Sequence, residues 1–237
     1  MTPLAKLSRQ AHLLFRMTIC DFKLRDQGTA LGFLWTLFNP LLMFGVLYLV
    51  FASWFGRLID NYPVYLALGI IHWNFFSLAT SNSVTIFERK RHLLKSFPVS
   101  RSLIPLSAVL TVFISYILES ALVLFMCSFL VSITLSGLIW FAALLILHLF
   151  LALGVSLFLS NAFIFFRDIS HLWAIALRIG FFLTPVFYPL SVVSDAKLVV
   201  LKLNPLYHLF TASRSAILTG TVEIDGYFLY LIIFSIS

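Results

Sequence analysis

Charged side chains are scarce in this chain of 237 residues. Only 11% of the residues are charged, whereas 61% are hydrophobic, and the mean hydropathy is +1.04. Soluble domains carry about a quarter charged residues, so a soluble globular fold is excluded. The composition instead indicates an all-α bundle of membrane helices. In a membrane protein, the net charge of +7 does not indicate a nucleic-acid partner. Its distribution among the loops indicates the orientation of the helices.

Patterns that would indicate catalysis or metal binding are also missing. The six histidines show no metal-ligand spacing, and no glycine-rich loop ends in Gly-Lys-Ser/Thr. No nucleophile elbow occurs either. We therefore expect no enzyme activity, no metal and no cofactor in this chain.

Cysteine is limited to Cys20 and Cys127. Because Cys127 lies deep in an apolar run, a disulfide is not expected. A removable signal peptide is not expected either, since no short apolar core with a small-residue cleavage site follows Lys6 and Arg9.

Long uncharged runs are what the sequence does contain. The run from 102 to 166 has Glu119 as its single charge and must fold back, most naturally at Ser136–Gly137. We expect six transmembrane helices, each matched to a hydrocarbon core of about 30 Å. The last run is too short to cross, so the chain as given is expected to stop inside its sixth helix. The expected ranges are 33–55, 62–87, 102–133, 138–164, 169–189 and 227–237.

The basic residues divide the loops into two sides. Residues 1–31 and 88–101 each hold five Lys or Arg, and two spans separate them, so both regions lie on the same side of the membrane. The positive-inside rule makes that side cytoplasmic. We therefore predict a multi-pass protein of the bacterial inner (plasma) membrane with its N-terminus inside and residues 190–226 outside.

Residues 1–30 differ from the spans. Leu4, Leu7 and Ala11 recur at helical spacing among basic residues. This pattern is typical of an amphipathic helix that lies in the membrane interface. It fits a general surface anchor and a dedicated docking element equally well.

The cytoplasmic segment 88–101 combines charge with an apolar group. Leu93, Leu94 and Phe97 can form a short helix with an apolar knob, ended by Pro98. Such an element can fit a groove on a partner subunit. The alternative is an ordinary positive-inside loop.

Two ionisable residues, Glu119 and Arg178, fall inside the predicted spans. A charge in contact with lipid costs several kcal/mol, so both should face protein or water, and we expect them to pair. A structural salt bridge is favoured over a proton relay, because the other spans offer no further carboxylate.

Aromatic residues make up 16% of the chain. Because aromatic rings stack on the apolar faces of sugars, Trp35, Trp73, Phe75 and Phe76 are candidates for the wall of a glycan path. Packing between helices is the alternative for each of them.

Several stretches of the sequence, in order, resemble the membrane subunits of type-2 ABC exporters that move bacterial polysaccharides. The family's first-helix signature resembles LGFLWTLFNPLLMFGVLYLVF, and its coupling helix with the start of the third span resembles LLKSFPVSRSLIPLS. The loop before the fifth span and that span's outer end resemble FFRDISHLW and FFLTPVFYPLS. The outer re-entrant segment resembles LNPLYHLFTASRSAIL. The matches cover nearly the whole chain, and the incomplete sixth helix departs from the family pattern.

The resemblance implies a homodimer of six-helix subunits with two P-loop ATPase subunits, which would bind ATP and Mg²⁺. Members of the family export O-antigen, capsule or teichoic-acid glycans on a polyprenyl-diphosphate carrier through the membrane lipids. The residues whose positions match a contact to the ATPase subunit are Arg89, Arg91, Leu93, Leu94, Phe97, Pro98, Arg167 and Asp168. The residues that match an outer gate of re-entrant helices, over 190–220 and just before it, are Tyr188, Pro189, Asn204, Pro205, Tyr207 and Arg214.

The join between the interface helix and the first span carries two further hypotheses. Arg25, with Gly28 and Gly32, is expected to receive the lipid diphosphate, since arginine binds phosphate through paired hydrogen bonds. A plain interfacial anchor is the alternative. Asn39–Pro40 interrupts the first span, so we expect a bend that faces the dimer axis or a neighbouring helix.

Two other functions compete with polysaccharide export. One is a drug or lipid exporter subunit of the same family. The other is a secondary transporter, which would need coupling-ion groups inside the membrane and commonly shows internal repeats. Neither feature is evident in the sequence.

Overall fold

The computed structural model describes residues 3–25, 32, 34–96, 100–193 and 201–222, and these residues form helices, turns and loops without strands. The predicted all-α class is therefore confirmed for this part of the chain. Its helices are α1 Pro3–Arg25, α2 Leu34–Phe55, α3 Tyr62–Val84, α4 Ile86–Arg89, α5 Arg91–Ser96, α6 Leu103–Cys127, α7 Leu135–Phe165, α8 Ile169–Leu183, the 3-10 turn η1 Leu190–Val192, and α10 Pro205–Leu218.

Four of the described helices, α2, α3, α6 and α7, are long and apolar enough to cross a membrane. α8 is also apolar but has only 15 residues. The predicted helix over 169–189 is wrong beyond Leu183. Thr184 precedes a proline and takes extended backbone angles, which end the helix. The expected sixth span, 227–237, lies outside the described residues.

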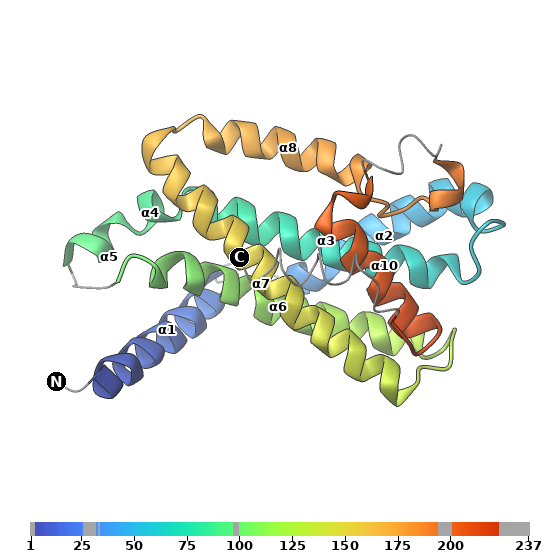
Figure 1. Ribbon diagram of the computed structural model, residues 1–237, viewed down its shortest axis with the longest axis horizontal. Coiled ribbons are helices and arrows are strands. Elements are labelled where there is room, and N and C mark those ends of the chain that lie inside the picture. Colours follow the sequence, from blue (N-terminus) through green and yellow to red (C-terminus); the bar gives the residue numbers. More distant parts are fainter. Residues whose placement is uncertain (1–2, 26–31, 33, 97–99, 194–200, 223–237) are drawn as a thin grey trace.

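The bundle has two distinct ends (Figure 1). α4, α5 and the turn between α7 and α8 lie at one end, which we call the basic end because it carries Arg89, Arg91 and Arg167. The turns that join α2 to α3 and α6 to α7 lie at the opposite end with the C-terminal part of α10, and we call this the α10 end. The basic end corresponds to the side predicted to be cytoplasmic.

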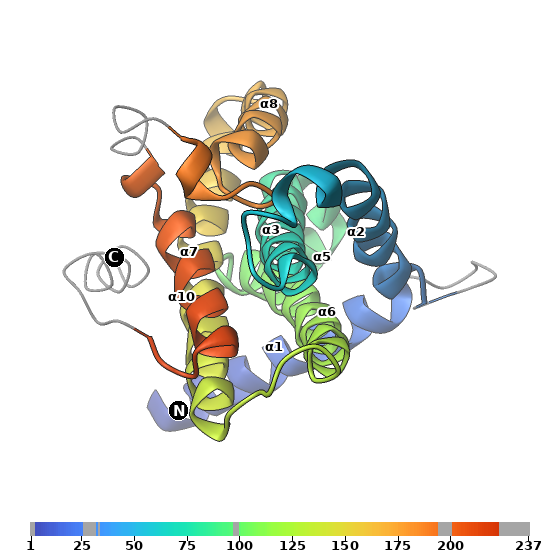
Figure 2. The ribbon, with the colours of Figure 1, turned by 90° about the vertical axis from the view of Figure 1, so that its right-hand side faces the viewer.

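α3 forms the centre of the bundle. It packs against α2, α6, α7, α8 and α10, and Figure 2, viewed from the α10 end, shows it surrounded by these helices. Large apolar side chains such as Leu66, Ile71 and Phe75 are fully buried on it. Of the 23 residues of α3, 14 are buried, as expected for a helix with neighbours on most sides.

α2 and α8 lie on the outside of the bundle. Pro40 is the single buried residue among the 22 described in α2, and no residue of α8 is buried. Leu49 of α2, for example, is 83% exposed. An apolar surface of this extent must contact lipid or another protein chain.

A buried chain of three polar side chains joins α3, α6 and α7. The hydroxyl of Tyr116 on α6 is hydrogen-bonded to Nδ1 of His72 on α3, and to Nδ1 of His148 on α7 at 3.2 Å. Phe75 stacks on the Tyr116 ring with the centroids 4.3 Å apart. Because a buried polar group without a partner is costly, this chain fixes how the three helices pack.

α1 is held to the basic end by several polar contacts. The Thr111 hydroxyl on α6 donates to the Thr18 carbonyl at 3.3 Å, and Lys90 forms an ion pair with Asp21. An N-terminal helix is thus confirmed over 3–25, and residues 26–30 of the predicted range lie outside the described residues.

Candidate functional site

A cavity of about 410 Å³, which we call the central cavity, lies between α2, α3 and α8. It unites four residues that the sequence singled out for different reasons: the predicted bend Asn39–Pro40, the aromatic Trp73 and the intramembrane Arg178. Its lining residues are Asn39, Pro40, Met43, Ile70, Trp73, Asn74, Ser77, Leu177, Arg178, Phe181 and Phe182.

The wall of the central cavity is partly aromatic and partly hydrogen-bonding. The rings of Trp73 and Phe181 meet edge to face with centroids 5.8 Å apart. Gly180 permits this approach of α8 to α3, because a Cβ there would lie 2.9 Å from Cη2 of Trp73. Asn39 and Asn74 add amide groups to the wall. Such a surface can stack on sugar rings and bind their hydroxyl groups.

Seven of the eleven lining residues were not identified from the sequence: Met43, Ile70, Asn74, Ser77, Leu177, Phe181 and Phe182. Helical spacing could have found several of them. Ser77 lies one turn from Trp73, and the two phenylalanines lie one turn from Arg178, so each shares a helix face with a residue that was identified.

Phe75 and Phe76 do not line the central cavity, and their assignment to the glycan path is wrong for this conformation. Both are buried in the core, where Phe75 stacks on Tyr116 and Phe76 meets Trp173 edge-on. Each residue along a helix turns by about 100°, so Phe75, two residues after Trp73, points to nearly the opposite side. Trp73 therefore faces the cavity, whereas Phe75 faces α6. Trp35 is 50% exposed at the start of α2, outside the cavity lining, and its role stays a prediction.

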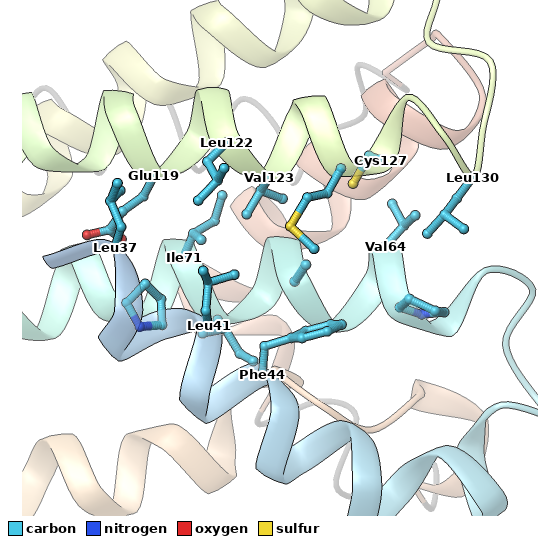
Figure 3. A pocket seen from close by; sticks show the side chains of 15 residues that line it. Leu37, Leu41, Phe44, Val64, Ile71, Glu119, Leu122, Val123, Cys127 and Leu130 are labelled. Carbon is cyan, nitrogen blue, oxygen red and sulfur yellow. The ribbon is translucent and has the colours of Figure 1, made fainter. Parts of the chain in front are cut away.

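The expected pairing of Glu119 with Arg178 is wrong. Glu119 is buried, and its Oε2 accepts a hydrogen bond from Nδ2 of Asn74 at 3.1 Å. Figure 3 shows the Glu119 carboxylate beside Leu37 at one end of a small apolar cavity of about 40 Å³. Arg178 instead lines the central cavity, and Asn74 lines it too. The amide of Asn74 therefore binds Glu119, where the sequence had predicted Arg178.

At the α10 end, Arg214 is enclosed by main-chain carbonyls. Its Nη2 donates to the Val186 carbonyl at 2.8 Å and its Nε to the Tyr65 carbonyl at 3.2 Å. The guanidinium also lies 3.4 Å from the centroid of the Tyr65 ring, a cation–π contact. Gly69 leaves room for this arrangement, because a side chain there would collide with the Val186 carbonyl.

The loop after α8 is fastened to α3 by tyrosine hydroxyls. Tyr62 donates to the Phe187 carbonyl at 3.0 Å, and Tyr65 donates to the Tyr188 carbonyl at 2.9 Å. Tyr188 in turn donates to the Phe182 carbonyl at 2.9 Å. The loop that follows the aromatic wall is therefore tied to the central helix.

Asn204 joins this loop to α10. Its Nδ2 donates to Thr184 Oγ1 at 2.9 Å, while its Oδ1 accepts from the Leu206 amide at 3.0 Å and caps α10, with Pro205 in the first turn. Pro189 and Tyr207 are buried nearby in the same region of the chain. The six residues assigned to the outer gate thus belong to the α8–α10 region, although a gating role stays a prediction.

A second cavity, of about 560 Å³, opens at the basic end between α1, α3, α4 and α6. Arg25, Arg89 and Lys90 line it together with Asp21. Lys90 is paired with Asp21 and donates to Ser107 at 3.3 Å, and Arg89 donates to the Asn82 carbonyl. We call it the basic cavity.

Arg25 connects α1 to α2. Its Nη2 donates to Thr36 Oγ1 at 2.6 Å. Thr36 is also the residue whose carbonyl loses its helical donor, because Pro40 has no N–H. Gly32 has a φ of +48°, a backbone conformation suited to glycine at this change of direction. Gly28 lies outside the described residues.

The predicted coupling helix is two short helices instead of one. α4 and α5 are separated at Lys90, and Leu93 and Leu94 pack inward against Ile86 and Ile104. Both leucines stay partly exposed although α6 offers them an apolar surface, so the apolar knob as a contact to a partner subunit stays a prediction. Phe97 and Pro98 lie outside the described residues.

The exposed part of this region is basic. Arg89, Arg91 and Lys95 are exposed, and so are Arg167 and Asp168 in the turn between α7 and α8. Both segments lie at the basic end (Figure 1). A contact with a partner subunit would therefore meet these charges beside the partly exposed Leu93 and Leu94.

Comparison with known proteins gives a family match over most of the chain. The model of the family described as "ABC-2 type transporter" matches residues 12–218. These residues include α2 to α10 and therefore both cavities.

Curated relatives cover a similar part of the sequence. An "O-antigen export system permease protein RfbA" of Myxococcus xanthus is 30% identical over 205 residues, which is 86% of this chain and 79% of that protein. A protein of the same description from Klebsiella pneumoniae is 27% identical over 214 residues, 90% of this chain and 83% of that protein. A second one from Klebsiella pneumoniae is 25% identical over the same length.

Proposed function

Because the chain belongs to the ABC-2 type transporter family, we propose that it is the membrane permease subunit of an ATP-driven exporter that moves a lipid-linked polysaccharide of the O-antigen type across the inner membrane. The relatives from Myxococcus xanthus and Klebsiella pneumoniae are O-antigen export permeases by description. Four helices of sufficient length and apolarity agree with an integral membrane protein.

The central cavity is the observation that carries the proposal. It has an aromatic side, Trp73 and Phe181, and a hydrogen-bonding side, Asn39 and Asn74. A glycan presents both apolar ring faces and hydroxyl groups, so this wall suits it. An exporter of apolar drugs would need neither the amides nor the cation of Arg178.

Two copies of the chain would form the pathway. α2 and α8 border the central cavity and have almost no buried residues within one copy. In the proposed homodimer these two helices face the symmetry axis, so that the two cavities line one channel. The exposed apolar surface of α2 supports this arrangement.

The basic end would receive two P-loop ATPase subunits. Exposed Arg89, Arg91, Arg167 and Asp168 are the proposed contacts, and ATP and Mg²⁺ would bind in the partner. Closure of the ATPase subunits would push on α4 and α5. The inward packing of Leu93 and Leu94 against Ile104 at the start of α6 supports transmission of that movement into the bundle.

The basic cavity is the proposed first site for the lipid diphosphate. Arg25 lies there with Arg89 and Lys90, so three cations face Asp21 alone among the charged lining residues. A diphosphate at the membrane surface would bind to such an excess of positive charge. The alternative is that Arg25 only anchors α1 to α2 through Thr36.

The experiment is to purify the chain with its partner ATPase and measure ATP hydrolysis with and without polyprenyl-diphosphate-linked glycan. We expect the glycan lipid to stimulate hydrolysis, and Arg25→Ala to weaken that stimulation several-fold. Arg57→Ala, in the exposed turn after α2, is the matched control and should leave the stimulation intact. Stimulation by amphipathic drugs without a response to the glycan lipid would favour the drug exporter.

A further inference from the structure

Arg178 is a permanent charge placed well along the apolar helix α8. It lies nine residues after Ile169, the first residue of α8, which is about 14 Å along a helix. Within the described part of the chain no carboxylate pairs with it, and its side chain is exposed to the central cavity. An arginine at such depth is costly in lipid, so it must face an anion or water.

A second copy of the chain cannot supply that anion. Of the nine acidic residues in the sequence, only Glu119 falls within the predicted spans, and it is 3% exposed and already bonded to Asn74. A symmetry-related copy would bring a second Arg178 toward the same channel. Dimer formation therefore increases the positive charge, and the groups that can solvate it are water or the anion of a ligand.

The surroundings of Arg178 narrow the chemistry of that ligand. The amide of Asn39 and the second N–H of the Asn74 amide, whose first N–H donates to Glu119, offer hydrogen-bond donors, while the Ser77 hydroxyl donates to the Asn74 carbonyl. No acidic side chain lines the cavity. The volume of about 410 Å³ equals that of roughly a dozen waters at ~30 Å³ each. Donors around one guanidinium, without a competing carboxylate, suit a phosphate group.

We propose that the central cavity is a second diphosphate site, in which Arg178 binds the headgroup of the carrier lipid halfway across the membrane. The inference rests on the proposed function. A diphosphate leaving the basic cavity would otherwise enter the hydrocarbon region without a counter-charge, which is strongly unfavourable. The guanidinium can hold two phosphate oxygens through paired hydrogen bonds, while Trp73 and Phe181 contact the first sugars.

Equilibrium binding of ³²P-labelled undecaprenyl diphosphate tests the site. The full chain with its partner ATPase is placed in nanodiscs of neutral phosphatidylcholine, and carries Arg25→Ala so that the basic cavity contributes less. We expect Arg178→Gln to weaken binding about 10- to 100-fold, the effect of losing hydrogen bonds to a charged group. The affinity of Arg178→Lys should lie between those of the parent and of Arg178→Gln, because lysine keeps the charge but loses the planar fork. Arg57→Gln is the control and should bind like its parent.

A purely structural role for Arg178 would change this binding without regard to headgroup charge. The preference for undecaprenyl diphosphate over undecaprenyl monophosphate is therefore measured as well, and it should disappear in Arg178→Gln. Three outcomes would each overturn the proposal. The parent and Arg178→Gln could bind equally well, the Arg25→Ala parent could fail to bind, or equimolar phosphatidylglycerol could displace the ligand. Failure of the wild-type complex to respond to glycan lipid would instead overturn the proposed function, because the binding measurement requires no glycan and no ATP.

Discussion

The guanidinium of Arg214 is held by two main-chain carbonyls rather than by a carboxylate. We expect Arg214→Leu to lower the free energy of unfolding by about 3–6 kcal/mol, because it removes two hydrogen bonds from a charged donor that contribute about 1.5–3 kcal/mol each. Arg214→Lys should lose less, since an ammonium keeps the charge but not the fork that reaches Val186 and Tyr65 together. Thermal unfolding of the purified protein in detergent gives the measurement.

Arg57, exposed in the turn after α2, provides the control for Arg214. Arg57→Leu should leave the unfolding temperature unchanged within error. An Arg214→Leu protein that unfolds at the wild-type temperature would show that these carbonyls find other donors and that the guanidinium does not fasten the loop.

Glu119 is predicted to act in packing rather than in transport. Its carboxylate accepts one hydrogen bond, from Asn74, and the amide oxygen of glutamine can accept the same bond. Glu119→Gln should therefore export at the wild-type rate, whereas Glu119→Leu should lose about 1–3 kcal/mol of stability because Asn74 is left without its acceptor. Export measured in cells, with unfolding measured on the purified protein, separates the two effects. Loss of export in a stable Glu119→Gln protein would reinstate a proton-carrying role.

Single charged residues were predictable from the sequence because charge is so scarce there. Glu119 and Arg178 are conspicuous among apolar neighbours, and Arg214 matches a family motif. Their partners were not predictable. The partner of Glu119 is a neutral amide on another helix, and the partners of Arg214 are carbonyls, a group that every residue carries. The scarcity of charge identifies the charged residue, but only the packing of the helices shows which groups bind it.

The hydroxyl of Tyr116 joins three helices, so removing it should loosen their packing as a group. Tyr116→Phe leaves Nδ1 of His72 and of His148 without the partner that each has in the native bundle. We expect a loss of about 2 kcal/mol, from two hydrogen bonds of about 1 kcal/mol each, with faster hydrogen exchange in α3, α6 and α7 together. Tyr48→Phe on the exposed face of α2 is the matched control. A change confined to α6 would contradict a shared connection.

The spans themselves were predicted well, whereas breaks and ends within the other helices were predicted poorly. Four of the expected spans correspond to α2, α3, α6 and α7 within a few residues, because a long apolar run can form only one kind of structure in a membrane. The end of α8 was placed too late, although Pro185 could have indicated it. The break between α4 and α5 has no comparable signal, because it depends on Lys90 reaching Asp21 of α1 and on leucines packing against α6.

The whole molecule separates its charges from its apolar surfaces. Basic residues gather at one end, the core surrounds α3, and the least buried helices, α2 and α8, both border the central cavity. The sequence predicted the first of these features, since loop charges can be counted. It could not predict which spans are peripheral, because all of them are similarly apolar. That distinction depends on the tertiary contacts of α3.

The arrangement of α2 predicts which of its faces meets the second copy. Met43 lines the central cavity, whereas Leu49 lies six residues further along, on a different face of the helix. In a Cys20→Ser background, Met43→Cys should yield a cross-linked dimer with a bis-maleimide in native membranes. Leu49→Cys should yield little, although its side chain is the more exposed of the two. If accessibility alone governed the reaction, Leu49→Cys would cross-link better, so the ratio of the two dimer bands decides between an axis at the cavity and an axis elsewhere. A dominant Leu49→Cys dimer would move the channel away from Arg178 and would remove the reason for a diphosphate to pass it.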